Sequence, residues 1–598
     1  MAFNKMSWLG MFPTILLISI FMNGNAVSVK DGDTVNISLL NYSVSSSMMV
    51  EQYISVAPLT TVTLNILNIP RVASFVLAHT HSYDHSTTLS YSEILNPHGY
   101  INGTDIGLVK MNGPIPMQFF IYNGNPDAAY MLVIIQAYGK YAPLPGGCNM
   151  EFSVETAPYL QLRLSRSLIT VDAQLASLPS LSLACDDYSS LIHLEIYHMY
   201  LPERDFTPES YYDAIRKMST VDSIRSNGKL VAAPERGSTL RRTFSAYPGT
   251  GSVYGVIAVS GYSASAYVPA FTYACGSKYI PDEDMCEILT APFSKLLCAM
   301  IFFCGLLMCF FGHRFFKTEM FLLGFIAAAN VAYMIIASYN PDFNEPTLDV
   351  FSFFSGLGFG LLWLGFWLCF GIPILTVLLA TLTLGYILAS VAMFAGLGDY
   401  ALLQWDINYW TAFICIMISI CVIFSPLMHK ANILCCAILG AFAIVAPIDH
   451  YIGSNLKFIV VNTMRRATVP EFSSAIIDPP FQWKDCLLSV SWILMSIIGV
   501  GAQCWLQRGK PPFPPPPYQP RDESFTTTRR RGLSLVRGED ATERTPLVTD
   551  ARILYGASSD SVFSSPATHN DVGTSGSRIG RLLTVLKIYH RDPVDSNK

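Results

Sequence analysis

The chain has 598 residues, of which 51% are hydrophobic and 14% are charged, and its mean hydropathy is +0.38. This composition is that of a chain with a large apolar block and differs from that of an ordinary soluble domain. The net charge of −5 at pH 7 gives no indication of a nucleic-acid partner.

Residues 1–26 have the pattern of a signal peptide. Lys5 supplies a positive charge, Trp8–Met22 form a short apolar stretch, and Gly24-Asn25-Ala26 place small residues at the cleavage position. The stretch is short for a membrane span, so an uncleaved anchor is the less favoured alternative. Cleavage leaves the new N-terminus outside the cytosol.

Residues 27–290 are predicted to be a β-rich ectodomain. Six short runs alternate polar with apolar residues, which is typical of half-buried strands: Thr61–Ile66, Met117–Tyr122, Tyr130–Ala137, Leu160–Leu164, Leu191–Ile196 and Val253–Val259. One large sandwich is possible, but we favour two, over residues 27–165 and 166–290. A helix is predicted at Pro208–Met218, with Thr207 as its N-cap.

The ectodomain carries four cysteines, Cys148, Cys185, Cys275 and Cys286. An even number in an oxidising compartment predicts two disulfides. Four cysteines allow three pairings and the sequence does not decide between them; we favour Cys275–Cys286 with Cys148–Cys185. Three N-glycosylation motifs, at Asn36, Asn41 and Asn102, also fall in this segment.

His79, His81, Asp84 and His85 form a cluster that invites comparison with a zinc site, because His79 and His81 share one face of a strand. A polar strand edge that runs into a turn is the favoured interpretation. The sequence contains no HExxH spacing, no GxSxG elbow and no phosphate-binding glycine loop. We therefore expect no catalytic residues, no metal and no cofactor.

Residues 291–507 are predicted to form a seven-helix transmembrane bundle. A span needs roughly 20 apolar residues to cross the hydrocarbon core of a bilayer. Seven apolar runs are each long enough, and they centre on Ile301–Phe311, Met320–Tyr339, Leu348–Leu368, Ile372–Phe394, Tyr409–Leu427, Ala431–His450 and Cys486–Leu506. Seven crossings from an outside N-terminus place the C-terminus in the cytosol.

The charges of the loops support this orientation. Arg314, Lys317, Lys430, Arg508 and Lys510 follow the first, fifth and seventh runs, on the expected cytosolic side. The loop between the sixth and seventh runs is an exception, because it should lie outside and yet is rich in Lys and Arg. That loop is long enough to hold a surface helix of its own.

The span interiors contain few polar groups. We expect Asn330 to form a hydrogen bond between helices, and Asp449 and His450 to lie at the membrane interface; a substrate site is the less favoured alternative for each. A G-protein-coupled receptor is not supported, because the Asp/Glu-Arg-Tyr and NPxxY motifs are missing from the third and seventh runs.

Ser352, Gly356 and Gly360 recur at four-residue spacing in the third run. Small residues with this spacing line one helix face and permit another helix to approach closely. Tight packing within the bundle is the favoured interpretation, and a pore lined by glycine is the alternative.

Residues 508–598 are predicted to be a disordered cytosolic tail, because they are rich in Pro, Ser, Thr and Arg. Pro515, Pro516 and Tyr518 fit a PPxY ligand for WW domains, with a stiff spacer as an equal alternative. Glu543, Leu547 and Val548 resemble an acidic dileucine signal that sorting adaptors read, with valine at the second leucine position.

Several segments together resemble the transmembrane 7 superfamily member 3 family. They are PGGCNMEF at 145–152, YVPAFTYAC at 267–275, FFGHRFFKTE at 310–319, PPFPPPPY at 511–518 and ERTPLV at 543–548. The resemblance implies a glycosylated seven-span protein that takes part in cell survival and in the attenuation of protein-folding stress. It implies no catalytic residues and no agreed ligand.

We expect a non-enzymatic multi-pass membrane glycoprotein whose ectodomain binds an unknown luminal or extracellular partner or senses luminal conditions. The lipid bilayer surrounds the bundle, and the tail is read by trafficking proteins at the plasma membrane, the endosome or the lysosome. A channel or transporter formed by the bundle is the alternative, and an atypical seven-span receptor is the weaker one.

Overall fold

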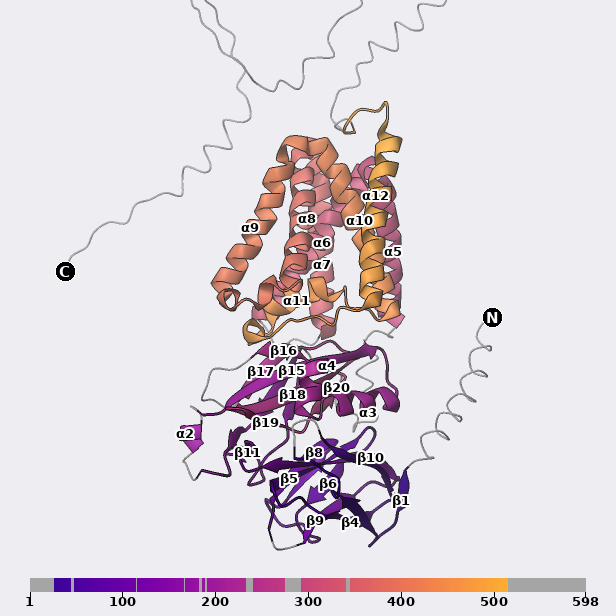
Figure 1. Cartoon of the computed structure of the whole chain (residues 1–598). Coiled ribbons are helices and arrows are strands. Elements are labelled where there is room, and N and C mark those ends of the chain that lie inside the picture. The colour runs from indigo at the N-terminus through magenta and orange to yellow at the C-terminus, as the bar shows by residue number, and fades with distance from the viewer. Residues whose placement is uncertain are drawn as a thin grey trace, which may run out of the picture. The chain divides into compact units, whose positions relative to one another are not determined.

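The computed structural model describes residues 26–44, 48–113, 116–165, 167–181, 185–188, 191–232, 240–274, 292–339 and 345–514. These residues belong to the first of two compact units, which ends at Gln519. Strands fill its N-terminal part and long helices its C-terminal part (Figure 1). The predicted signal peptide and nearly all of the predicted disordered tail lie outside the described residues.

The first sandwich consists of two five-stranded sheets, with strand orders β1-β3-β10-β5-β8 and β2-β4-β9-β6-β7. Its strands are β1 (Val27–Val29), β2 (Thr34–Ser38), β3 (Val50–Val56), β4 (Thr60–Leu67), β5 (Ala73–Ser82), β6 (Thr87–Ser90), β7 (Tyr100–Gly103), β8 (Asp105–Met111), β9 (Met117–Asn123) and β10 (Ala129–Gly139). Strand β9 buries every second residue, as the alternation predicted.

The second sandwich begins earlier than we predicted. Its strands are β11 (Leu144–Cys148), β12 (Gln161–Leu164), β13 (Leu168–Ala173), β14 (Leu175–Ser177), β15 (His193–Glu203), β16 (Lys229–Ala232), β17 (Leu240–Ser245), β18 (Thr250–Ser260), β19 (Ser263–Ala266) and β20 (Ala270–Thr272). Because β11 pairs with β14 and β12 pairs with β13, the boundary lies between β10 and β11, and the predicted boundary at 165/166 is wrong. Alternation cannot show which sheet a strand joins.

Two helices lie between the sandwiches, α3 (Pro208–Lys217) and α4 (Val221–Asn227). The predicted helix is confirmed as α3, and Thr207 is its N-cap. One apolar cluster joins Leu132 and Ile134 of β10, Tyr212 of α3 and Val253 of β18. Strand β10 is therefore buried on both faces, and the two sandwiches share a core.

The favoured pairing of Cys148 with Cys185 is confirmed, and the disulfide joins β11 to the short helix α2 (Cys185–Tyr188). Cys275 and Cys286 lie outside the described residues, so the second pairing stays a prediction.

The membrane part contains α5 (Pro292–Phe311), α6 (Phe316–Tyr339), α7 (Glu345–Phe370), α8 (Pro373–Phe394), α9 (Asp406–Phe424), α10 (Met428–Ile452), α11 (Phe458–Thr468) and α12 (Trp483–Gln507). Among the described residues, five continuous helical stretches are long and apolar enough to cross a membrane, whereas we predicted seven separate ones. Two of them, Lys295–Tyr339 and Asp406–Ile452, are 45 and 47 residues long. The 3-10 turns η2 (Gly312–Phe315) and η5 (Ser425–Leu427) divide each of these into two α-helices.

The small-residue face of α7 packs against α6. A Cβ atom on Gly356 would lie 2.9 Å from the carbonyl oxygen of Phe325, and one on Gly360 would lie 3.0 Å from that of Phe321. Ser352 is buried and donates to the carbonyl oxygen of Leu348. The glycines therefore permit close helix contact, in agreement with the favoured interpretation.

Candidate functional site

The chain between α10 and α12 carries a helix, α11, as its length predicted, together with the 3-10 turn η6 (Phe472–Ser474). No residue of α11 is exposed, so the prediction that this helix lies on the surface is wrong. We call residues 449–485 the outer connection. It lies between the helices and the second sandwich (Figure 1). Polar side chains from both parts meet there, and we call this contact the junction.

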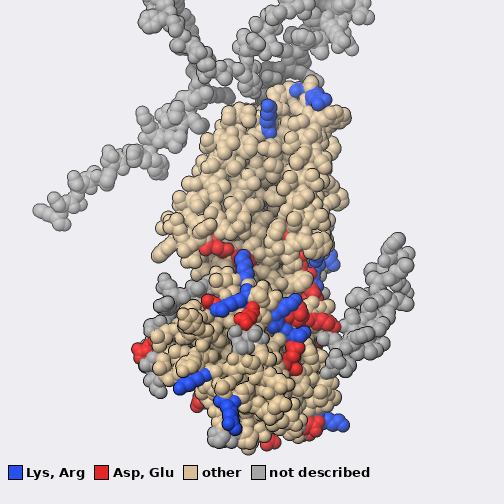
Figure 2. All heavy atoms as spheres, viewed as in Figure 1, with Lys and Arg blue, Asp and Glu red and all other residues tan. Residues whose placement is uncertain are grey.

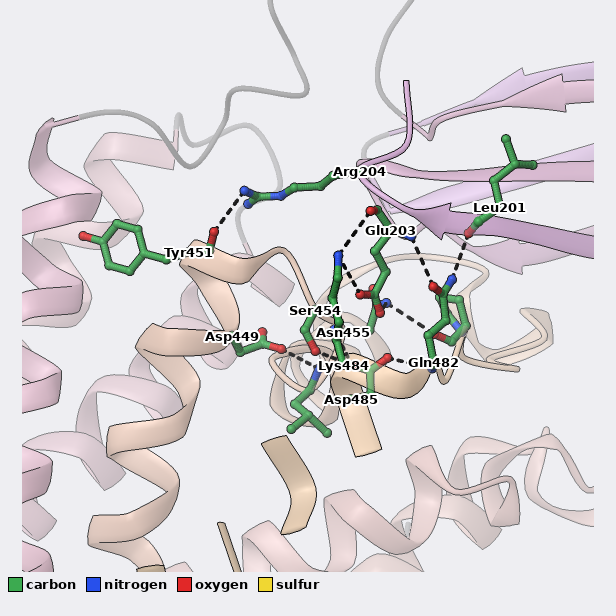
Figure 3. Close-up of polar contacts among 12 residues, drawn as sticks. Leu201, Glu203, Arg204, Asp449, Tyr451, Ser454, Asn455, Gln482, Lys484 and Asp485 are labelled. Carbon is green, nitrogen blue, oxygen red and sulfur yellow. Dashed lines mark hydrogen bonds and ion pairs between the residues drawn. The ribbon is translucent and has the colours of Figure 1, made fainter. Parts of the chain in front are cut away.

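The end of β15 enters the outer connection through two neighbouring charged residues (Figure 3). The guanidinium of Arg204 donates to the carbonyl oxygens of Tyr451 and His450, at 3.1 and 2.9 Å. Glu203 is only 5% exposed, and its carboxylate accepts from Asn455 Nδ2 at 3.1 Å and lies 3.6 Å from Lys484 Nζ. Gln482 adds two hydrogen bonds to the backbone of β15.

Gly453 makes room for the Arg204 side chain. It ends α10 with a φ of +82°, which glycine adopts at little cost. A Cβ atom at this position would also collide with the Arg204 guanidinium. Glycine is thus required here by the backbone and by the contact with the second sandwich.

Two buried aspartates hold the outer connection in shape. Asp485 accepts hydrogen bonds from the backbone N–H groups of Asn455 and Gln482, at 2.7 and 3.0 Å, and from the Ser454 hydroxyl. Asp449 accepts from the N–H groups of Leu456 and Lys457. Asp449 is therefore fully buried inside protein, and the position of Asp449 and His450 at the membrane interface stays a prediction.

A second contact of the junction is a short backbone bridge. Ser245 N–H donates to the Ile476 carbonyl oxygen at 3.0 Å, and Ile476 N–H donates to that of Thr243 at 2.9 Å. Arg465 on α11 also donates to the Ala246 carbonyl oxygen at 2.8 Å. The outer connection thus extends the sheet of β17 by one residue, as an added strand would.

The environment of Glu203 makes the junction sensitive to pH. Burial, together with the neighbouring Asp485, raises the pKa of the Glu203 carboxyl to about 7. A proton on Glu203 is therefore favoured when the junction is closed and unfavoured when the carboxylate is exposed to water.

A second polar cluster lies at the opposite ends of the helices. Asn432 on α10 donates to Glu319 on α6 at 3.0 Å, and its amide group lies 3.1 Å from His313 Nδ1. Gln503 on α12 contacts His313 N–H at 3.3 Å, and His313 Nε2 lies 2.7 Å from the Pro512 carbonyl oxygen. We call this group the inner cluster.

Glu319 is the residue that our sequence analysis missed. It is 1% exposed, one of its carboxylate oxygens has no hydrogen-bond partner among the described residues, and it precedes the apolar run that began at Met320. An ionisable group buried among membrane helices is a candidate functional residue. The signal in the sequence that could have identified Glu319 was its position one residue before that apolar run.

The histidine pair of the first sandwich is part of a buried chain of hydrogen bonds. His79 Nδ1 lies 2.7 Å from His81 Nε2, and His81 Nδ1 lies 2.7 Å from Asp105, which also accepts from the Tyr211 hydroxyl. Strand β5 lies between β10 and β8, so the predicted strand edge is wrong. Burial lowers the pKa of His79 well below its usual value. Among the described residues, no group of His, Cys, Asp and Glu is arranged to hold a metal ion.

The remaining residues that the sequence analysis named are the mid-helix asparagine, the glycosylation sites and the tail motifs. Asn330 donates to the Ile326 carbonyl oxygen within its own helix, so the predicted bond between helices is wrong. Asn36, Asn41 and Asn102 are exposed, as glycosylation requires, and their modification stays a prediction. The tail residues Pro515, Pro516, Tyr518, Glu543, Leu547 and Val548 lie outside the described residues.

Comparison with known proteins agrees with this architecture. Residues 26–138 match the TM7SF3-like N-terminal immunoglobulin-like domain, residues 143–278 the TM7SF3-like second immunoglobulin-like domain, and residues 298–504 the TM7S3/TM198-like domain. Transmembrane 7 superfamily member 3 of Homo sapiens is 30% identical over 459 residues, which cover 75% of this chain and 80% of that protein. The chain belongs to the transmembrane 7 superfamily member 3 family. The Mus musculus protein of the same name is also 30% identical, with 75% and 81% coverage.

The family domains place the junction at a domain boundary. Glu203 and Arg204 lie in the second immunoglobulin-like domain, whereas the outer connection and the inner cluster, except Pro512, lie in the TM7S3/TM198-like domain. The contacts of Figure 3 therefore join two separately recognised parts of this family.

Proposed function

We propose that this chain is a non-enzymatic membrane glycoprotein whose ectodomain is coupled to its membrane helices through the junction. The observation that carries the proposal is the insertion of Glu203 and Arg204 into the outer connection. A flexible tether would need no such contacts. A partner or a luminal condition that moves the second sandwich would therefore also move the ends of α10 and α12.

We further propose that the two long stretches each cross the membrane twice, so that the chain has seven crossings. A straight helix of 45 residues would be about 68 Å long, more than twice the hydrocarbon thickness. The contacts of His313 with Gln503 and Pro512 hold η2 near the end of α12, and His429 beside η5 has its ring 4.7 Å from His313. Turns η2 and η5 thus lie near the end of α12, at one end of the bundle, which we call the inner end.

The charges support an inner end in the cytosol. Arg314, Lys317, Lys430, Arg508 and Lys510 lie in or next to η2, η5 and the end of α12. Figure 2 shows acidic and basic residues over the sandwiches and basic residues at the far end, with an almost uncharged surface between them. An outside N-terminus and a cytosolic tail fit this distribution.

The cellular role we propose is the one that the family resemblance implies, namely cell survival and the attenuation of protein-folding stress. Exposed Asn36, Asn41 and Asn102 fit an ectodomain that faces the lumen or the exterior. The tail motifs fit WW-domain and adaptor proteins at the plasma membrane or the endosome–lysosome system.

The test is a rescue experiment in cells that lack the protein. Wild-type chain should lower an unfolded-protein-response reporter and raise survival during folding stress. A variant with Glu203→Ala and Arg204→Ala should be present in equal amount at the membrane and fail to rescue. Exposed Arg71 provides the control, since Arg71→Ala leaves the junction intact. Full rescue by the junction variant would contradict the proposal.

Transport by the bundle is the second candidate, and buried Glu319 is the observation that favours it. A proton-coupled transporter reconstituted in liposomes should show solute uptake that Glu319→Gln abolishes. Gly356→Leu is unsuitable for this test, because it would force α6 and α7 apart. Liposomes that contain correctly folded protein and show no solute uptake would count against transport.

A further inference from the structure

A cavity of about 1020 Å³ lies beside the junction and shares Gln482 with it. Its walls come from β15 and β16 of the second sandwich, the end of α8, α11, and α12. Drug-sized ligands occupy pockets of roughly 300–1,000 Å³, so the cavity can hold a large organic molecule.

The cavity has a charged end where the second sandwich meets the outer connection and the chain that follows α8. Lys229 Nζ lies 2.5 Å from Asp478, which His198 Nε2 also contacts at 3.1 Å, and Asp399 lies in the same wall. The Lys229 side chain is 67% exposed, so its ammonium retains donors for a further anion. Asp399 accepts a hydrogen bond from the Ile477 N–H at 2.8 Å through Oδ1, and its carboxylate is the negative group in this wall that can also face a cation. This end therefore offers both signs of charge within one pocket.

The other end is apolar and belongs to the membrane helices. Val391 and Phe394 of α8, Ile459 of α11, and Trp492 and Ile493 of α12 form its walls. Trp492 is held in place because its indole N–H donates to the Ile438 carbonyl oxygen at 3.1 Å. Ile493 is 58% exposed, so the apolar wall continues onto the outer surface of α12, where acyl chains lie.

We propose that this cavity binds a zwitterionic phospholipid of the outer leaflet. Its phosphate lies at Lys229, its ammonium lies at Asp399, and an acyl chain runs between α8 and α12. The charges select this headgroup: an anionic lipid would face both Asp399 and Asp478 with no positive group of its own to match them, and a sterol hydroxyl would leave both signs of charge unmatched. This inference goes beyond the proposed function and does not depend on it.

The test uses the purified full chain after its lipids have been removed by detergent exchange. Phosphatidylcholine, phosphatidylglycerol or cholesterol is returned in mixed micelles, and bound lipid is counted by native mass spectrometry while thermal unfolding is followed. We expect one tightly held phosphatidylcholine, a raised Tm, and binding at least fivefold weaker for the other two lipids.

Three variants locate the site. Ser489→Trp fills the cavity and Lys229→Gln removes the phosphate contact, so each should weaken phosphatidylcholine binding at least fivefold. Val490→Trp, on the neighbouring exposed position of α12, should leave binding unchanged. Equal loss in all three variants, equal binding of phosphatidylglycerol, preference for cholesterol, or no retained lipid would each overturn the proposal. Lys229→Gln changes an exposed side chain, so its result stands even where Ser489→Trp fails to fold.

Discussion

The two ends of the helix bundle solve the burial of polar groups in different ways. At the junction, Glu203 lies beside Lys484 and Asn455, and Asp485 receives three donors. At the inner cluster, Glu319 receives one amide donor from Asn432, and its other oxygen has no hydrogen bond within the part of the chain that the structure describes. One oxygen of Glu203 also lacks a hydrogen bond, but it lies 3.6 Å from the Lys484 ammonium, whereas no ion pair of Glu319 is formed within the described part of the chain. An ion pair ties two parts of the chain together, whereas a buried carboxylate with no cation beside it is a candidate for binding a proton or a ligand. The junction at the outer end therefore couples the second sandwich to the helices. The inner cluster holds the candidate residue for proton or ligand binding within the bundle.

Asp485→Ala should cause the largest loss, because it leaves three donors of the outer connection unpaired. Each unpaired buried donor costs about 1–3 kcal/mol, so we expect a loss of about 3 kcal/mol or more in the free energy of unfolding. Thermal unfolding of the full chain in nanodiscs measures it. Asp84→Ala, at an exposed turn, is the control, and an equal Tm for the two variants would refute the role of Asp485.

Gly356→Leu tests the packing that lies between the two ends. Phe325 and Ala329 leave no room for the new side chain, and overpacking costs about 1–3 kcal/mol. Gly358→Leu, on the same helix, meets open space and should change the Tm little. Equal destabilisation by the two substitutions would show that α6 and α7 do not pack through this face.

Gly453→Ala and Gly396→Ala separate the cost of backbone strain from the cost of losing Arg204. Both glycines have a positive φ, so each alanine costs about 1–2 kcal/mol of strain. Only alanine at 453 also displaces the Arg204 guanidinium, and we expect about 2 kcal/mol more at that position. Unfolding curves of the two variants give the difference between their free energies of unfolding. Equal values would show that Arg204 does not contribute to the junction.

Glu203 should make the junction tighter at mildly acidic pH. Its pKa is about 7 in the closed junction and near the ordinary value of 4.5 when exposed, so the closed state binds more protons between these pH values. The contribution is complete below pH 4.5 and is lost as the pH rises through 7. Hydrogen-exchange protection of residues 449–460, corrected for intrinsic rates, should fall from pH 5 to 8. Glu203→Gln should abolish the change, and an unaltered slope in that variant would contradict it.

The histidine pair should give an effect of opposite sign. The lowered pKa of buried His79 means that the unfolded chain binds the extra proton, so this contribution is present above pH 6.5 and is lost below it. Exchange protection of β5 should therefore fall on acidification, while that of the outer connection rises. His79→Leu should remove the change in β5, and persistence of the slope would assign it to another group.

Sequence patterns predicted the elements better than their partners. The alternation of residues 117–122 and 253–259 located β9 and β18, and the favoured Cys148–Cys185 disulfide is present. The same patterns placed the sandwich boundary too late, because strand pairing is a property of the tertiary structure and leaves no local periodicity. The seven apolar runs correspond to helices, although two pairs of them are continuous apart from a 3-10 turn.

The candidate site was harder to predict than the fold. Glu203 and Arg204 are ordinary residues at a strand end, and nothing near them in sequence names partners almost 250 residues away. Asp449 was visible as a charge at the end of a run, but its burial depends on the outer connection folding back over it. Only Gly453, directly after an apolar run, carried a local cue to a helix end.

The most direct test of the coupling is the distance distribution between the second sandwich and the outer ends of the helices. Spin labels placed as unnatural amino acids at exposed Ser226 on α4 and Leu402 in η4 (Ala401–Leu403) would report it in nanodiscs by pulsed dipolar spectroscopy. The coupling predicts one narrow distance peak in the wild-type chain and a broad one after Glu203→Ala with Arg204→Ala. A broad wild-type distribution that these substitutions leave unchanged would contradict it.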